Sequence, residues 1–169
     1  MGERILKPLP LTAERFAPYG DVIAAHKAQR AAMNEARFER FDDLARLDID
    51  AHDGGRPAVS IARSRIATKL PYRFDMVERH PRGSQAFIPL TRFKFIVVVG
   101  PPQESVTADE LEAFVTDGRQ GINYRRGTWH MPLIGLEEGQ EFLVIDRVPA
   151  ADNCEERIFD DPPLLAGPG

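Results

Sequence analysis

Cysteine is almost absent from this chain of 169 residues, in which Cys154 is the only one. A single thiol forms no intrachain disulfide and no thiolate metal cluster, and this usage is typical of a reducing compartment. Long hydrophobic runs are missing too, because the longest apolar stretch, residues 95–99, is far too short to span a bilayer. Residues 1–10 are charged and lack the apolar centre of a signal peptide. We therefore expect a cytoplasmic protein without a membrane partner.

The chain also lacks a cluster of positive charge. Its 22 basic and 26 acidic residues are mixed along the whole length and leave a formal net charge of −4. Nucleic-acid binding needs a concentrated basic face, so we expect no nucleic-acid partner. With 43% hydrophobic residues the chain can build a packed core, and its length suits one domain. We assign residues 1–160 to that domain and expect residues 161–169, rich in proline and glycine, to form a flexible tail.

Short strand patterns separated by turns dominate the second part of the chain. They cover residues 58–65, 71–77, 84–90, 93–99 and 142–147, with two further strands after the turns at Gly118 and Gly121. Alternating or β-branched segments of this length, with turn signals between them, are typical of a β-sandwich or β-barrel. The expected fold class is mainly β, with a few short helices.

Three segments depart from the strand pattern. Residues 12–16 predict one or two helical turns capped by the threonine at their start. Residues 24–37 have little apolar periodicity and predict either a surface helix or a mobile flap. Thr107 and Glu110 form a capping box that predicts a helix, although the chain from Phe114 onward fits a strand equally well.

Histidine and glutamate supply the residues best suited to chemistry. His26 and His52 lie in polar, loop-like sequence, and we expect them to be solvated. His80 ends a predicted strand, and His130 follows a glycine turn. Because residues two apart on a strand share a face, Glu78 and His80 should project together. Imidazole and carboxylate groups bind divalent cations or exchange protons near neutral pH.

The spacing of these residues resembles the two motifs of cupins, H-x-H-x(3,4)-E and G-x-x-H. Glu78, His80 and Gln85 occupy the ligand positions of the first motif, and Gly127 and His130 match the second. The resemblance implies a metal site, and the mixed ligand set suits a divalent ion such as Ni²⁺ or Mn²⁺. The spacing is equally compatible with a hydrogen-bonded strand end that binds no metal.

Longer segments resemble the ureidoglycolate lyase family. They are residues 78–89 (ERHPRGSQAFIP), 121–124 (GINY), 127–132 (GTWHMP), 145–147 (IDR), 19–23, 40–45 and 152–154. The resemblance covers residues 6–155 in the expected order. It implies a cupin-like double-stranded β-helix (a β-barrel) and a homodimer. It also implies cleavage of (S)-ureidoglycolate to glyoxylate and urea in allantoin and purine nitrogen catabolism.

That reaction needs a base for the substrate hydroxyl, an acid for the departing nitrogen and a cation for the carboxylate. We expect His80 and His130 to act as base and acid. Glu78 is the alternative base, because burial would raise its pKa. The chemistry requires no organic cofactor. A divalent metal, if bound, would lower the pKa of the substrate hydroxyl.

The expected substrate-binding residues are Arg63, Gln85, Asn123, Tyr124 and Trp129. An arginine can hold the substrate carboxylate in a bidentate manner, and strand alternation lets only one of Arg63 and Arg65 face inward. The two amides suit the ureido group, and the two aromatic residues suit either substrate contact or core packing. Asp146, at the end of an apolar strand, is expected to anchor Arg125 or Arg126.

Two other functions fit the same residues. One is a different metal-dependent cupin enzyme, such as a dioxygenase or a sugar epimerase. The other is a cupin that binds a small acid such as glyoxylate without catalysis. For a lyase, residue types leave open whether urea or ammonia is released, which stereoisomer reacts, and which of Glu78, His80 and His130 is the base.

Overall fold

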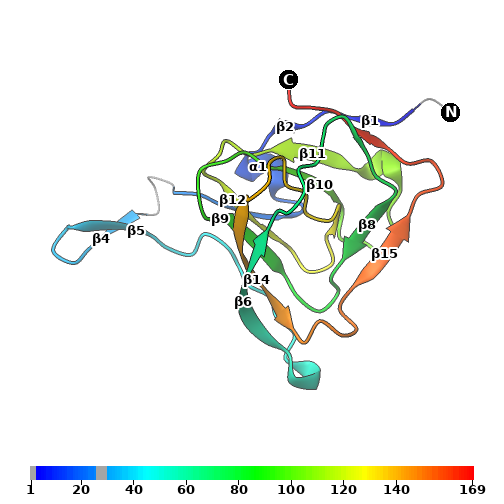
Figure 1. The fold of residues 1–169 in the computed structure, drawn as a ribbon. Helices are drawn as coiled ribbons and strands as arrows, with labels where there is room; N and C mark the ends of the chain where they lie inside the picture. The colour runs from blue at the N-terminus through cyan, green and yellow to red at the C-terminus, as the bar shows by residue number, and fades with distance from the viewer. Residues whose placement is uncertain (1–2, 26–29) are drawn as a thin grey trace.

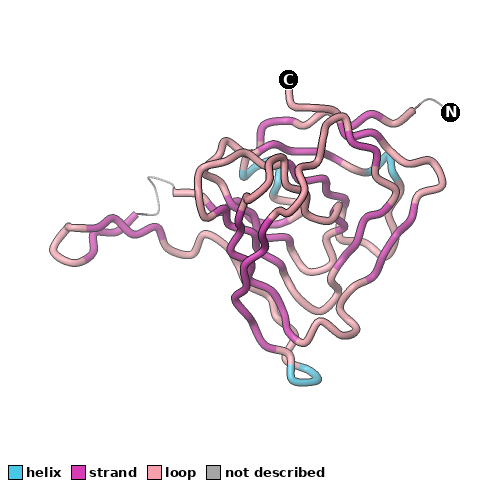
Figure 2. The backbone as a smooth tube through the Cα atoms, in the orientation of Figure 1, coloured by secondary structure: helices cyan, strands magenta, loops and turns pink. Residues whose placement is uncertain are grey.

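The computed structural model describes residues 3–25 and 30–169 and consists almost entirely of strands and loops (Figures 1 and 2). A six-stranded and a five-stranded sheet face each other across a shared core. A three-stranded sheet covers the outer face of the six-stranded sheet. The expected mainly β, cupin-like class is confirmed. Among the described residues, hydrogen bonding keeps the two large sheets separate and does not close them into one ring.

The five-stranded sheet joins strands that are distant in sequence. All its neighbours are antiparallel, and β14, which contains the apolar run expected at 142–147, pairs along its full length with β6. In spatial order the strands are β3 (Gly20–Ile23), β12 (Gly121–Tyr124), β9 (Gln85–Pro89), β14 (Glu141–Val148) and β6 (Arg56–Arg63).

The six-stranded sheet is built around β10, whose β-branched residues favour an extended backbone and are buried on both faces. The strand begins at Ile96, three residues later than expected. β10 pairs with β11 and β13, and β13 leads on to β8 and β15. In spatial order the strands are β15 (Glu155–Ile158), β8 (Met76–Arg79), β13 (Trp129–His130), β10 (Ile96–Gly100), β11 (Glu112–Val115) and β2 (Leu9–Pro10).

The third sheet joins a strand near the start of the chain to one near its end, and β1 lies beside the red C-terminal segment in Figure 1. It consists of β1 (Ile5–Leu6), β16 (Leu164–Leu165) and β7 (Tyr72–Arg73). Leu165 is fully buried and belongs to the same core cluster as Leu6. Residues 164–165 of the tail that was expected to be flexible thus form a strand, because two leucines within it have apolar surface to bury.

Strand alternation sends the side chains of β10 into two different cores. Ile96 and Val98 pack under the three-stranded sheet, whereas Val97 and Val99 pack against the five-stranded sheet. The second of these cores fills the space between the two large sheets, called the sheet interior below. Its residues are Leu11, Phe16, Tyr19, Val22, Phe87, Phe95, Val97, Val99, Phe114, Ile122, Tyr124, Phe142 and Val144.

A β-hairpin, β4 (Arg30–Met33) and β5 (Phe38–Phe41), stands away from the body of the molecule in Figure 1. The surface helix considered for residues 24–37 is therefore wrong for their described part from residue 30 onward. The segment lacks an apolar helical face to bury, and packing of such a face supplies most of the stability of a helix in a protein. Residues 26–29, with His26, lie outside the described residues.

Helical structure is confined to single turns in the described chain. α1 (Ala13–Phe16) is confirmed, with Thr12 Oγ1 accepting the Arg15 N–H at 3.2 Å. The expected capping box is present at η3 (Ala108–Glu110). The chain then enters β11, so the strand alternative for the chain from Phe114 onward is confirmed. η2 (His52–Gly54) forms the turn before β6. None of these helices is long and apolar enough to cross a membrane.

Candidate metal and active site

Three of the predicted residues meet at one end of the sheet interior. Glu78 on β8 lies directly opposite His130 on β13, and His80 follows the end of β8. Glu78 Oε1 is 3.5 Å from His130 Nε2 and 3.9 Å from His80 Nε2. One ligand atom of each residue lies within 4.8 Å of the others. The predicted shared face of Glu78 and His80 is therefore confirmed, and these three residues are called the triad below.

The two sequence motifs are joined by the backbone. Gly127, with φ +79°, forms the left-handed turn before β13, a conformation that favours glycine. Its N–H donates to the carbonyl oxygen of His80 at 3.0 Å. The glycine of one motif thus holds the backbone of the other motif beside His130.

Each imidazole of the triad is held at Nδ1 by a carbonyl oxygen. His80 Nδ1 is 2.6 Å from the oxygen of Asn153, and His130 Nδ1 is 2.9 Å from that of Thr128. Because a carbonyl oxygen only accepts, Nδ1 carries the proton and Nε2 presents a lone pair. Both Nε2 atoms are buried and have no hydrogen-bond partner among the described residues. Two buried lone pairs aimed at one carboxylate suit a divalent cation.

The charge states of the triad also suit a divalent cation. The neighbouring His130 imidazole is the main cause that lowers the pKa of Glu78, and its effect outweighs burial. The expected raised pKa of Glu78 is therefore wrong, because burial was considered without the imidazole partner. Burial, followed by repulsion from His130, lowers the pKa of His80. Neutral imidazole and ionised carboxylate are the forms that bind metal.

Tyr124 fixes the ring of His130 from the opposite sheet. The two rings are stacked, with centroids 4.2 Å apart and planes at 16°. Burial raises the pKa of the Tyr124 phenol well above its usual range, so the hydroxyl stays protonated. The predicted site residue Tyr124 is therefore brought to the triad, where it packs against a potential ligand.

A second polar row faces the triad across the sheet interior. Gln85 lies opposite Tyr124 on β9, and its Nε2 donates to Asp146 Oδ2 on β14 at 3.2 Å. Both side chains line a pocket of about 70 Å³ together with His80. Asp146 therefore does not anchor Arg125 or Arg126 as expected. Its inward position was detectable in the sequence, since it is two residues beyond Val144 on an alternating strand.

Arg63 is not brought to this site. It pairs with Glu141 at 2.6 Å, between the edge strand β6 and its neighbour β14, and its side chain is 69% exposed. Asp146, which does line the pocket, is five residues further along β14 and therefore roughly 17 Å from this pair. Arg65 is also exposed, just beyond the end of β6. Neither arginine lies at the triad, where a carboxylate clamp was expected.

Asn123 and Trp129 point away from the sheet interior. Asn123 alternates with Tyr124 on β12, so its amide lies on the outer face and donates to Asp21 and to the carbonyl of Arg46. Trp129 alternates with His130 and packs in the core under the three-stranded sheet, where Arg79 lies over its ring at 4.9 Å. The packing interpretation of Trp129 is thus the one the structure supports.

The arginines near the triad are already occupied. Arg147 donates to three backbone carbonyls, including that of Asp50. Arg82 pairs with Asp50 and Asp53, and Arg79 pairs with Glu155. With Glu78 and Asp146 adding negative charge, an anionic substrate would meet no free cation among these residues. A bound metal ion would supply one.

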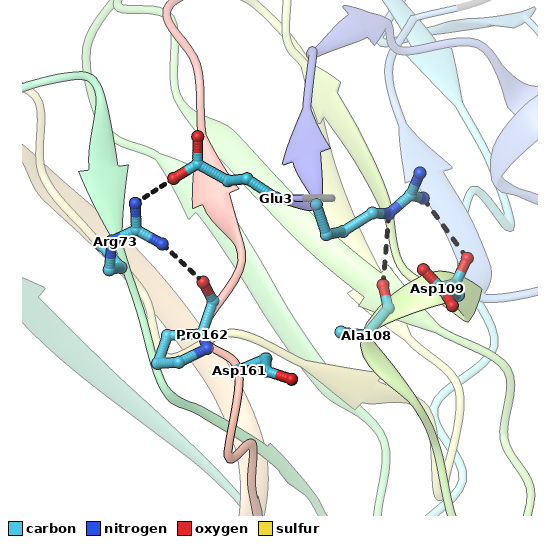
Figure 3. Close-up of a pocket in the computed structure, with 7 residues that line it drawn as sticks. Glu3, Arg73, Ala108, Asp109, Asp161 and Pro162 are labelled. Atoms are coloured by element: carbon cyan, nitrogen blue, oxygen red, sulfur yellow. Dashed lines mark hydrogen bonds and ion pairs between the residues drawn. The ribbon is translucent and has the colours of Figure 1, made fainter. Parts of the chain in front are cut away.

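A separate hollow of about 380 Å³ lies under the chain ends (Figure 3). Arg73 pairs there with Glu3 and donates to the carbonyl of Pro162, and Arg4 donates to the carbonyls of Ala108 and Leu111. Its arginines are used in joining segments of the fold. This hollow therefore offers no equivalent of the triad.

His52, as expected, is an exposed surface residue, paired with Asp50.

Proteins of similar sequence identify the family to which this chain belongs. The family model described as ureidoglycolate lyase matches residues 3–166. A ureidoglycolate lyase of Burkholderia mallei (strain NCTC 10229) is 47% identical over 165 residues, covering 94% of this chain and 95% of that protein. One from Pseudomonas paraeruginosa (strain DSM 24068 / PA7) is 42% identical over 166 residues, covering 98% and 97%. This chain belongs to the ureidoglycolate lyase family.

Proposed function

We propose that this protein is a lyase that cleaves ureidoglycolate into glyoxylate and urea with the help of a divalent cation held by Glu78, His80 and His130. The observation that carries the proposal is the pair of buried, unpartnered imidazole nitrogens beside one carboxylate. Family membership supplies the substrate. A bound Mn²⁺ or Ni²⁺ would contribute positive charge for the substrate carboxylate and lower the pKa of its hydroxyl.

The protein's own residues have distinct tasks in this proposal. The carbonyls of Asn153 and Thr128 hold the imidazoles in one tautomer, and Tyr124 holds the His130 ring. Glu78 Oε1 faces the imidazoles, whereas Oε2 faces Cys154, which lines the pocket. We assign proton transfer to Glu78 Oε2, which takes the hydroxyl proton and returns it to the departing urea nitrogen.

The dimensions of the pocket favour a small acid over the larger substrates of other cupin enzymes. Sites for drug-sized ligands usually measure roughly 300–1,000 Å³. The pocket beside His80 measures about 70 Å³. This supports ureidoglycolate over a sugar nucleotide. Because every bond change is a proton transfer or a carbon–nitrogen cleavage, the reaction needs no organic cofactor.

The decisive experiment follows the products. Protein stripped of metal and then reloaded with Mn²⁺ or Ni²⁺ is incubated with racemic ureidoglycolate, and glyoxylate, urea and ammonia are quantified. We expect equal glyoxylate and urea, no ammonia, and consumption of half the substrate, as for an enzyme specific for the (S) isomer. Ammonia release would indicate a hydrolase instead. Stoichiometric binding without turnover would indicate a non-catalytic cupin, and full activity of the metal-free protein would remove the cation from the proposal.

We further propose a cytoplasmic homodimer acting in allantoin and purine nitrogen catabolism. The single cysteine fits a reducing compartment. β6 is an edge strand of the five-stranded sheet and exposes Val59 and Ile61. An exposed apolar edge strand is a natural surface for a second copy. Sedimentation velocity of the intact chain, with a monomer as the contradicting result, tests the dimer.

A further inference from the structure

Asp146 has no part in the proposed cleavage, although it lies in the same pocket as His80. Its carboxylate accepts the amide N–H of Gln85 and lines the pocket together with His80 of the triad. We propose that Asp146, together with Gln85, binds the ureido group of the substrate and thereby selects for it. This assignment rests on the proposed function and adds a residue to the substrate contacts.

Three observations place Asp146 inside the site. On β14 it alternates with Ile145 and shares a face with Val144 and Phe142, both of which are buried in the sheet interior. It lines the pocket together with His80 and Gln85. Its charge is close enough to His80 to act on that imidazole. The residue is therefore directed at the reacting region and away from the outer surface.

The chemistry of the pair matches the chemistry of a ureido group. A ureido group presents three N–H donors and one carbonyl acceptor, and an ionised carboxylate only accepts. Asp146 uses Oδ2 for Gln85, so Oδ1 is the atom directed to a substrate N–H. Gln85 uses its amide nitrogen for Asp146, so its amide oxygen is left as a second acceptor. Two acceptors on one wall thus face a donor-rich group.

The placement also sets the orientation of the substrate. The carboxylate and hydroxyl end would lie at the triad on the six-stranded sheet, and the ureido end would lie at Asp146 and Gln85 on the five-stranded sheet. The carbon–nitrogen bond to be cleaved would then lie between the two walls. A site built to hydrogen-bond a substrate N–H rejects analogues that lack it.

Binding of two probes to metal-loaded protein tests the assignment. Ureidoacetate has the carboxylate and the ureido group but no hydroxyl to react, whereas glycolate has the carboxylate and hydroxyl without a ureido group. In Asp146→Asn the amide oxygen can still accept from Gln85, but an N–H₂ group faces the substrate donors. We expect calorimetric affinity for ureidoacetate to fall roughly 10- to 100-fold while that for glycolate stays within about twofold.

The matched control is Glu141→Gln, on the same strand but in the exposed pair with Arg63. It should leave both affinities unchanged. If Asp146→Asn weakens both probes equally, the residue only supports the fold, and the assignment is overturned. Unchanged ureidoacetate binding, or no ureidoacetate binding to the wild-type protein, overturns it as well. Because these measurements need no turnover, they are independent of the product assay that tests the lyase activity.

Steady-state kinetics and a double-mutant cycle separate binding from support. For ureidoglycolate, Asp146→Asn should raise KM by more than it lowers kcat. Gln85→Ala should weaken ureidoacetate binding too, and the double variant should lose less than the two single losses combined, because residues in one hydrogen-bonded unit are coupled. Fully additive losses would contradict a shared ureido site.

Discussion

The two ends of the sheet interior are built from the same strands, yet their chemistry is opposite. At one end the paired strands present only apolar side chains, including Phe87, Ile122, Phe142 and Val144. Two residues further along the same strands, the side chains are Gln85, Tyr124 and Asp146, opposite the triad. The step of two residues is the repeat of a strand face, so one sheet face carries both a core and a site.

The difference between the ends lies in how their polar atoms are satisfied. At the apolar end, Phe142 packs edge-to-face against three other phenylalanines and leaves no polar atom to be paired. At the polar end, two imidazole nitrogens are buried without a protein partner. Buried unpaired polar atoms cost stability, so the polar end lowers the stability of the fold unless a ligand compensates. Substitutions at the two ends should therefore separate activity from stability.

The largest effect on activity is expected at the polar end. His130→Ala removes one side of the triad, and with it the charge stabilisation that the cation supplies. We expect kcat/KM to fall on the order of 10²- to 10⁴-fold, with reduced metal content and little loss of thermal stability. His52→Ala, at an exposed surface histidine, is the control. Near-normal turnover in His130→Ala would show that the polar end of the sheet interior is not the active site.

The largest effect on stability is expected at the apolar end. Phe142→Ala leaves a cavity among Phe87, Phe93 and Phe95 and should cost about 3–5 kcal/mol in the free energy of unfolding. Urea denaturation measures this loss. Activity per folded molecule should be close to that of the wild type, because Phe142 lies away from the triad. Phe38→Ala, on the exposed hairpin, is the control and should change stability little.

A smaller effect is expected at Tyr124, where the two ends meet. Tyr124→Leu removes the ring that stacks on His130, whereas Tyr124→Phe keeps it. We expect the leucine variant to lose about 2- to 10-fold in kcat/KM and the phenylalanine variant to be nearly unchanged. Equal losses in both variants would show that the hydroxyl, and not the stack, is what matters.

The smallest effect is expected at Arg63, on the outer surface. Arg63→Ala removes an exposed ion pair with Glu141, and such pairs contribute little to stability. Both kcat/KM and the unfolding midpoint should stay close to their wild-type values. A large increase in KM would instead restore Arg63 as a carboxylate-binding residue and place part of the site outside the sheet interior.

Features that depend on neighbouring residues in the sequence were predicted well. Alternation put Glu78 and His80 on one face, and the N-cap of Thr12 and the capping box of η3 formed as expected. Strand alternation also showed that Asn123 and Tyr124 point to opposite sides, but it does not tell which side is the interior. Only one of the two side chains can therefore point into a single site on that strand, although both were expected to bind substrate.

Composition was a weaker guide where the outcome depended on residues outside the segment considered. The segment 24–37 was expected as a helix or flap, and its described part forms a hairpin. The tail was expected to fray, yet Leu165 is buried against a strand from the other end of the chain. In both cases the strand that pairs with the segment lies outside the stretch of sequence whose composition was considered.

By itself, the sequence determined the mainly β class, the family and the pairing of Glu78 with His80, because these follow from local alternation and from motifs within short segments. Only the tertiary structure decided that His130 lies opposite Glu78, that Asp146 faces the same pocket and that Arg63 lies outside it. The physical reason is that register between strands is set by hydrogen bonding and core packing across the whole sheet. A shift of one residue would send every one of these side chains to the other face.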